Sequence, residues 1–134
     1  LGLKHNVFVT ESELNGQMLA ENDIMVIGIP RRNDLLPKMP VRITVQSDSF
    51  VLNDRRYDKA SDTFFGVFEH PTATNRVAAL FMPLSVQYAE VVARKITHYG
   101  KYSYLAFQGG KNLDKGIWPV ETSPLIYEWN QSRE

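Results

Sequence analysis

Two nearly continuous apolar runs stand out along the chain, DIMVIGIP at 23–30 and RVAALFMP at 76–83. Runs of this kind are typical of strands buried on both faces, as in a parallel sheet. Two shorter runs, NVFV at 6–9 and YSYLAF at 102–107, have the β-branched and aromatic content of further strands. We therefore expect these four segments to lie side by side in one sheet.

A helix is expected between the strand at 6–9 and the strand at 23–30. Thr10 and Glu13 have the spacing of a capping box, in which each side chain satisfies a free backbone amide of the first turn. This spacing predicts a helix over 11–20, although Gly16 costs it about 1 kcal/mol. The segment from 6 to 30 is therefore expected to form a strand, a helix and a parallel strand.

A second unit of the same kind is expected around the strand at 76–83. Ser85 is placed to cap the helix that follows, and Gly100 is placed to end it in the left-handed conformation. The strand at 102–107 then completes a crossover to a parallel neighbour. The apolar face of this helix is expected to consist of Val86, Ala89, Val92, Ala93 and Ile96, which recur at helical spacing.

Between these units the pattern is typical of antiparallel structure. FVLNDRRY at 50–57 predicts a small hairpin that turns at Asn53-Asp54. A strand at 62–71 is joined to 76–83 by so few residues that the two must be antiparallel. The remaining segments are expected to be a proline-rich loop at 30–40, a loop at 109–124 and an edge strand at 125–129.

These elements predict an α/β fold with a Rossmann-like mixed sheet, mainly parallel, made of two βαβ units with an inserted antiparallel hairpin. The 134 residues suit a single α/β domain over 1–134. Because the chain opens on Leu1 rather than on methionine, we expect this domain to be excised from a longer chain.

Charge and cysteine content narrow the choice of partners. Fifteen basic side chains balance fifteen acidic ones, which leaves no overall positive field for nucleic acid or an anionic membrane, so neither is expected as a partner. No apolar run reaches the roughly 18 residues of a membrane span. The chain has no cysteine, which excludes disulfides, thiolate nucleophiles and cysteine-bound metals.

Signatures of catalysis and of cofactor binding are missing from the sequence. His5, His70 and His98 lack the spacing of metal ligands, so structural roles are expected and no metal site is predicted. Ser85 lacks the flanking glycines of a nucleophile elbow. Gly109-Gly110 follows a strand but precedes no evident helix, so no phosphate loop and no cofactor are predicted. Carboxylate chemistry stays open, because no pair of acidic residues is singled out.

One group of polar residues survives as a candidate site. Ligands of open α/β sheets bind beyond the carboxyl ends of the strands, and here those ends lie near 28–33, 82–85 and 107–112. Guanidinium groups there could hold a carboxylate or a phosphate bidentately. The alternative is a solvated loop rim or a surface docked on another domain. The predicted rim consists of Arg31, Arg32, Asn33, Ser85, Lys111 and Asn112.

Three stretches carry a resemblance: ENDIMVIGIPRRN, FFGVFEHPTATNRVAALFMPLS and VARKITHYGKYSYLAFQGGKNLDKGIWP. Over about residues 22–129 the chain resembles the non-catalytic C-terminal α/β region of bacterial zinc-aminopeptidase-like proteins of the gluzincin class. The catalytic signature of that class, His-Glu-x-x-His, is absent, so no catalytic or zinc residue is carried over. The resemblance implies a bacterial, extracytoplasmic origin.

The resulting expectation is a non-catalytic accessory or interaction domain of a larger peptidase-like protein, whose partner is the catalytic domain of the same polypeptide. The alternative is a small-anion or nucleotide-binding module that uses the predicted rim. An enzyme with unrecognised carboxylate or histidine chemistry is the third possibility.

Overall fold

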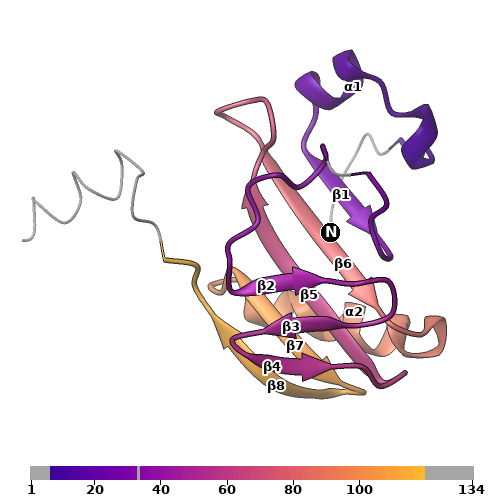
Figure 1. Ribbon diagram of the computed structural model, residues 1–134, viewed down its shortest axis with the longest axis vertical. Helices are drawn as coiled ribbons and strands as arrows, with labels where there is room; N and C mark the ends of the chain where they lie inside the picture. The colour runs from indigo at the N-terminus through magenta and orange to yellow at the C-terminus, as the bar shows by residue number, and fades with distance from the viewer. Residues whose placement is uncertain (1–6, 33, 120–134) are drawn as a thin grey trace, which may run out of the picture.

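The computed structural model describes residues 7–32 and 34–119. They form a five-stranded sheet of order β1-β6-β5-β7-β8 and a three-stranded sheet of order β2-β3-β4, which lies across the front of the first (Figure 1). The strands are β1 (Ile24–Ile27), β2 (Ile43–Val45), β3 (Phe50–Leu52), β4 (Arg55–Tyr57), β5 (Asp62–Glu69), β6 (Val77–Pro83), β7 (Tyr104–Gln108) and β8 (Lys111–Gly116). The helices are η1 (Glu11–Glu13), α1 (Gly16–Glu21), η2 (Val86–Tyr88), α2 (Ala89–Ile96) and η3 (Thr97–Tyr99).

The prediction of a Rossmann-like, mainly parallel sheet is wrong. Only β1 and β6 pair in parallel, while every other pairing in both sheets is antiparallel. The connections explain this arrangement. β5 reaches β6 through residues 70–76, and β7 reaches β8 through 109–110, and connections this short reverse the chain rather than cross over a sheet. The expected loop at 109–124 is wrong in part, because it contains strand β8. Residues 120–124 and the expected strand at 125–129 lie outside the described residues.

The first βαβ unit does not form. Residues 7–9 are not in a strand, and the side chains of Val7 and Phe8 are exposed. The helix predicted over 11–20 is divided into η1 and α1, because the Asn15 side chain accepts a hydrogen bond from the Met18 amide and begins a new helix there.

The second unit forms in an altered way. β6 and β7 run in the same direction, but β5 lies between them and is antiparallel to both. Ser85 stands before η2 and makes no side-chain cap, so its predicted capping role is wrong. Gly100 has a φ of −60° rather than the left-handed value expected.

The predicted hairpin is confirmed, with β3 and β4 joined by Asn53 and Asp54 at positive φ. β2 was not predicted and adds a third strand to it. The Asn53 amide donates to the Tyr104 hydroxyl at 3.1 Å and to the Asp114 carboxylate at 3.0 Å. These two contacts join the tip of the small sheet to β7 and β8.

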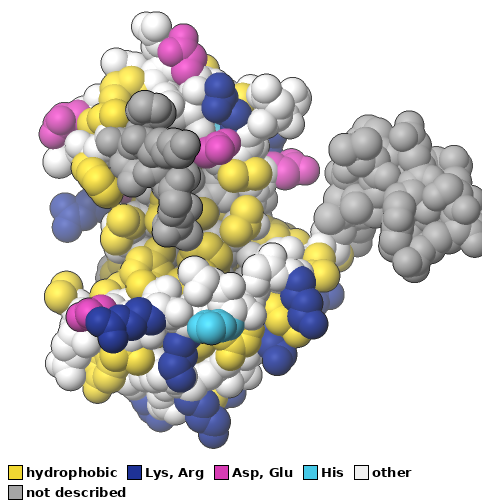
Figure 2. All heavy atoms as spheres, turned by 180° about the vertical axis from the view of Figure 1, so that it is seen from behind, with side chains coloured by type: hydrophobic (Ala, Val, Ile, Leu, Met, Phe, Trp, Pro, Cys, Tyr) yellow, Lys and Arg dark blue, Asp and Glu magenta, His cyan; other side chains and the backbone are white. Residues whose placement is uncertain are grey.

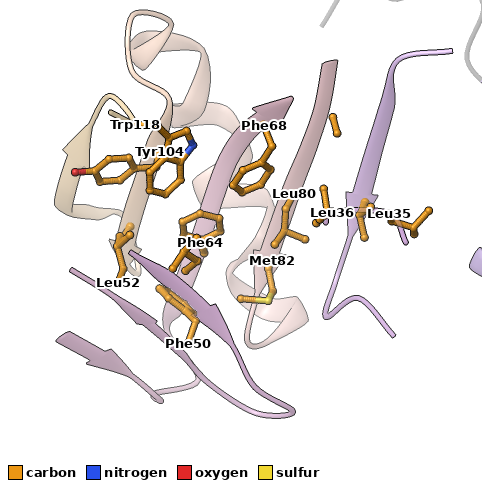
Figure 3. Packing of buried hydrophobic residues seen from close by; sticks show 14 of the residues in the cluster. Leu35, Leu36, Phe50, Leu52, Phe64, Phe68, Leu80, Met82, Tyr104 and Trp118 are labelled. Carbon is orange, nitrogen blue, oxygen red and sulfur yellow. The ribbon is translucent and has the colours of Figure 1, made fainter. Parts of the chain in front are cut away.

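Between the two sheets lies a core rich in aromatic rings (Figure 3). Phe50 of the small sheet stacks on Tyr57 at 4.7 Å and meets Phe64 of the large sheet edge-on at 5.6 Å. Further along, Trp118 stacks on Tyr104 at 4.3 Å and donates from its indole nitrogen to the Val67 carbonyl at 2.9 Å. This face of the large sheet is closed.

The opposite face of the large sheet is packed against a single described helix of more than two turns, α2. Val92 of α2 is buried against Leu105 and Phe107 of β7. α2 therefore covers the β5–β7 side of this face, and β1 and β6 extend beyond it.

Candidate functional site

Within residues 7–32 and 34–119, no helix covers the apolar side chains where β1 and β6 extend past α2. Met25 and Ile27 of β1 are 41% and 63% exposed, and Val77 of β6 is 49% exposed. In the parallel register these side chains share one face with Phe81, which lies opposite Ile27. We call this surface, made of Met25, Ile27, Val77 and Phe81, the open strip.

The open strip continues into a groove beside α2. The groove has a volume of about 330 Å³, and its floor includes Phe65 and Phe81. Ala93 and Ile96 of α2 form its apolar wall, while an ion pair between Glu90 and Arg94 stands at its lip. In Figure 2 hydrophobic side chains gather across the middle of this face, between the α1 end above and the α2 end below.

The sequence predicted the strand at β1 but not its exposure. The apolar run at 23–30 was expected to be buried on both faces, yet only Val26 within β1 is buried. The apolar run shows that both faces of the strand are apolar, but the strand is buried only if helices or strands pack on each of them. Where one layer is missing, the same pattern produces an exposed apolar surface.

The carboxyl ends of β1, β6 and β7 do lie at one edge of the sheet, because these strands run in the same direction. The predicted rim is nevertheless spread along that edge. Arg31 follows β1 and Lys111 opens β8, and these are the two outermost strands. Four strand spacings of about 4.8 Å separate them, or roughly 19 Å.

Two members of the predicted rim are engaged in structural contacts. Arg32 forms a forked pair with Asp34, at 2.9 and 2.5 Å, and donates to the Glu11 and Leu14 carbonyls. This hydrogen bond from Arg32 lowers the pKa of Asp34 below its ordinary value. Asn112 donates to the Ala106 and Asp114 carbonyls, next to the irregular pairing of β7 with β8.

The other members differ in exposure and setting. Lys111 is exposed, Ser85 is half-buried before η2, and Asn33 lies outside the described residues. Arg31 is exposed and lines a cavity of about 540 Å³. Apart from Arg31, the described members of the rim do not line this cavity.

The histidines of the described residues stand apart from one another. His70 is buried, its Nε2 contacts the Asn22 carbonyl at 2.9 Å, and its Nδ1 accepts from the Thr72 and Ala73 amides. His98 is exposed in η3, and His5 lies outside the described part. Across residues 7–32 and 34–119, His, Asp and Glu side chains form no group of three or more that could hold a metal ion.

Comparison with known proteins does not place the chain in a family. No family model, curated protein or solved structure matches it. In the part of the chain that the structure describes, no helix is long and apolar enough to cross a membrane.

Proposed function

We propose that this chain is a non-catalytic interaction domain, and that the open strip is the surface with which it docks on another folded domain. The observation that carries the proposal is the exposure of Met25, Ile27 and Val77 on one continuous apolar face. Contiguous apolar patches of this kind mark interaction sites on soluble proteins. Arg32 and His70, which could otherwise suggest a binding or catalytic site, are engaged in hydrogen bonds within the fold.

The proposed occupant is an α-helix. The uncovered part of the face is two strands wide, or about 10 Å, which is the diameter of one helix with its side chains. β6 has seven residues, a length of about 23 Å that a helix of about 15 residues would match. α2 already provides the neighbouring helix against which such an occupant would pack.

Charges around the open strip define the helix further. Glu21 and Asp23 are exposed at the amino end of β1, and Arg94 stands at the lip of the groove. A complementary helix would carry an apolar stripe and basic residues toward Glu21 and Asp23, whereas Arg94 is already paired with Glu90. The resemblance supplies a concrete source for this helix, the catalytic domain of a bacterial zinc-aminopeptidase-like protein on the same polypeptide, and this association is part of the proposal.

Site-specific photo-crosslinking tests the proposal in the organism that produces the protein. A photoreactive phenylalanine analogue replaces Ile27 in the natural gene, and the cross-linked peptide is sequenced by mass spectrometry. We expect a cross-link to a segment with an apolar stripe at helical spacing and the charges described above. The substitution Met25→Glu should strongly reduce its yield, because it places a charge in the apolar contact.

Val41 provides a matched control, because it is an exposed apolar side chain in the turn before β2 and away from the open strip. The analogue at Val41 should not reach the same segment, and Val41→Glu should leave the cross-link from position 27 unchanged. A cross-link from position 27 that survives Met25→Glu, or that reaches no helical segment, contradicts the proposal.

A further inference from the structure

The chain turns sharply where β1 ends, and this turn builds a second concave site. The Gly28 amide donates to the Phe81 carbonyl at 2.8 Å, which continues the ladder by one residue. The φ of Gly28 is +91°, a value that favours glycine, and it turns the chain away from the sheet. The next residues, from Ile29 to Arg31, line the cavity of about 540 Å³ together with Pro83 and the end of β2.

The polar side chains that line this cavity can each donate a hydrogen bond. The Arg31 guanidinium has no hydrogen bond or ion pair within the described residues. Gln46 accepts at its Oε1 from the Ser49 hydroxyl at 2.9 Å and from Arg56 at 3.1 Å. These contacts fix the orientation of the Gln46 amide and leave its NH₂ group for another acceptor. Ser47 adds a hydroxyl to the lining.

The local charge favours an anion with one negative charge. Arg31 is the single charged group in the lining, since Arg32 is paired with Asp34 and does not line the cavity. The Glu11 carboxylate lies nearby, with both oxygens 3.2 Å from the Arg31 amide nitrogen. This fixed negative charge opposes a dianion such as a phosphate monoester more than a carboxylate.

The geometry points to a binding site for a small organic monocarboxylate with a short apolar body. Arg31 would hold the carboxylate as a fork, with Gln46 and Ser47 as further donors, and Ile29, Val45 and Pro83 would contact the apolar part. The cavity volume of about 540 Å³ falls within the usual range of small-molecule sites. The site shares no lining residue with the groove of the open strip, so it is independent of the proposed docking function.

Titration of the 134-residue chain with defined probes tests this site. Hexanoate and benzoate are the monocarboxylates, hexanamide is the neutral analogue, and inorganic phosphate is the competing anion. We expect saturable amide chemical-shift changes at Gly28, Arg31 and Ser47 with the carboxylates, and at least tenfold weaker binding of hexanamide and of phosphate.

Substitutions at Arg31 then show whether a carboxylate is held by two hydrogen bonds from the guanidinium or only attracted by its positive charge. Arg31→Gln should weaken hexanoate binding about tenfold or more, and Arg31→Lys should give an intermediate loss because it keeps the charge without the fork. Because Arg31 is exposed and its side chain makes no hydrogen bond or ion pair among the described residues, both variants should fold, as circular dichroism would verify. Arg76→Gln is the control, since Arg76 precedes β6 at the opposite edge of the sheet.

Three results would each overturn the site. The first is no saturable binding of either carboxylate, and the second is equal affinity for hexanamide or phosphate. The third is hexanoate binding that is unchanged in Arg31→Gln. A loss in Arg76→Gln as large as in Arg31→Gln would likewise show that overall charge, and not this cavity, binds the anion.

Discussion

On one face of the five-stranded sheet lies the three-stranded sheet, with six aromatic rings buried in the core on that side. On the other face α2 covers the β5–β7 side, while Met25 and Ile27 of β1 and Val77 of β6 are exposed. Both faces are apolar in sequence. The difference lies in what covers them, because Phe64 of the first face is fully buried while Ile27 of the second is mostly exposed. The comparison indicates that the first face stabilises the fold, whereas the exposed side chains of the second contribute little to its stability.

The largest contrast is expected between Phe64 and Ile27. Phe64→Ala removes a ring that contacts Phe50, Phe68 and Trp118, and should lower the free energy of unfolding by about 3–5 kcal/mol. Ile27→Ala removes a mostly exposed side chain and should change it by no more than about 0.5 kcal/mol. Urea unfolding followed by circular dichroism measures both values. Similar losses for the two variants would show that the open strip is part of the stabilising core.

A second contrast uses two glycines. A Cβ on Gly66 would lie 2.7 Å from the Phe64 ring and 2.9 Å from the Phe68 ring, so Gly66→Ala should cost about 1–3 kcal/mol through overpacking. Gly16 begins α1 with no atom within 4 Å of such a Cβ, so Gly16→Ala should be neutral or stabilise by up to about 1 kcal/mol. Thermal unfolding of both variants tests this, and a tolerated Gly66→Ala would mean that the aromatic core is less closely packed than the distances indicate.

The third contrast concerns the contact that holds the small sheet in place. Asn53→Ala loses the hydrogen bonds to Tyr104 and Asp114 and places alanine at a φ of +51°, which together should cost about 2 kcal/mol. Asn53→Gly loses the same bonds but accepts the backbone conformation, so it should cost about 1 kcal/mol. Denaturant unfolding separates the two effects. Equal losses would assign the whole effect to the hydrogen bonds and none to the backbone.

Local signals in the sequence predicted the β3–β4 hairpin and the antiparallel β5–β6 pair well, but not β2. Asn53-Asp54 is a turn whose chemistry depends on two adjacent residues, and the link from β5 to β6 is too short for a crossover. The position of β5 between β6 and β7 could not be predicted in this way, because it depends on contacts between residues far apart in the chain. The same limit applies to residues 7–9, which have strand composition but are not part of a strand.

The candidate site was predicted less completely for a related reason. The sequence placed Arg31 and Arg32 at the correct edge, but it could not distinguish the two guanidiniums. Arg32 is paired with Asp34 two residues away, and its contacts to the Glu11 and Leu14 carbonyls depend on how η1 folds against this loop. The open strip is exposed because no described helix packs on it, and the residues of β1 and β6 alone could not predict this.

The smallest expected effect tests whether every buried polar group in the core between the two sheets has a hydrogen-bond partner. The Tyr57 hydroxyl is buried without a hydrogen-bond partner among the described residues, and this burial raises the pKa of Tyr57 above its ordinary value, although Arg55, 5.2 Å from the ring centroid, opposes the shift. Tyr57→Phe removes the unpaired hydroxyl and keeps the stack on Phe50, so it should leave stability unchanged or raise it by less than about 1 kcal/mol.

The pH dependence of the same variant sharpens the test. Because the folded-state pKa of Tyr57 is raised, the unfolded chain loses its phenol proton first as the pH rises. The wild type should therefore lose stability as the pH rises above the unfolded value of about 10 and through the folded-state pKa. Tyr57→Phe should lack this component, which unfolding measurements between about pH 8 and pH 11 would reveal as a flatter profile. A variant that is clearly less stable at neutral pH would show that the hydroxyl has a partner, and that the closed face contains a polar contact at this position.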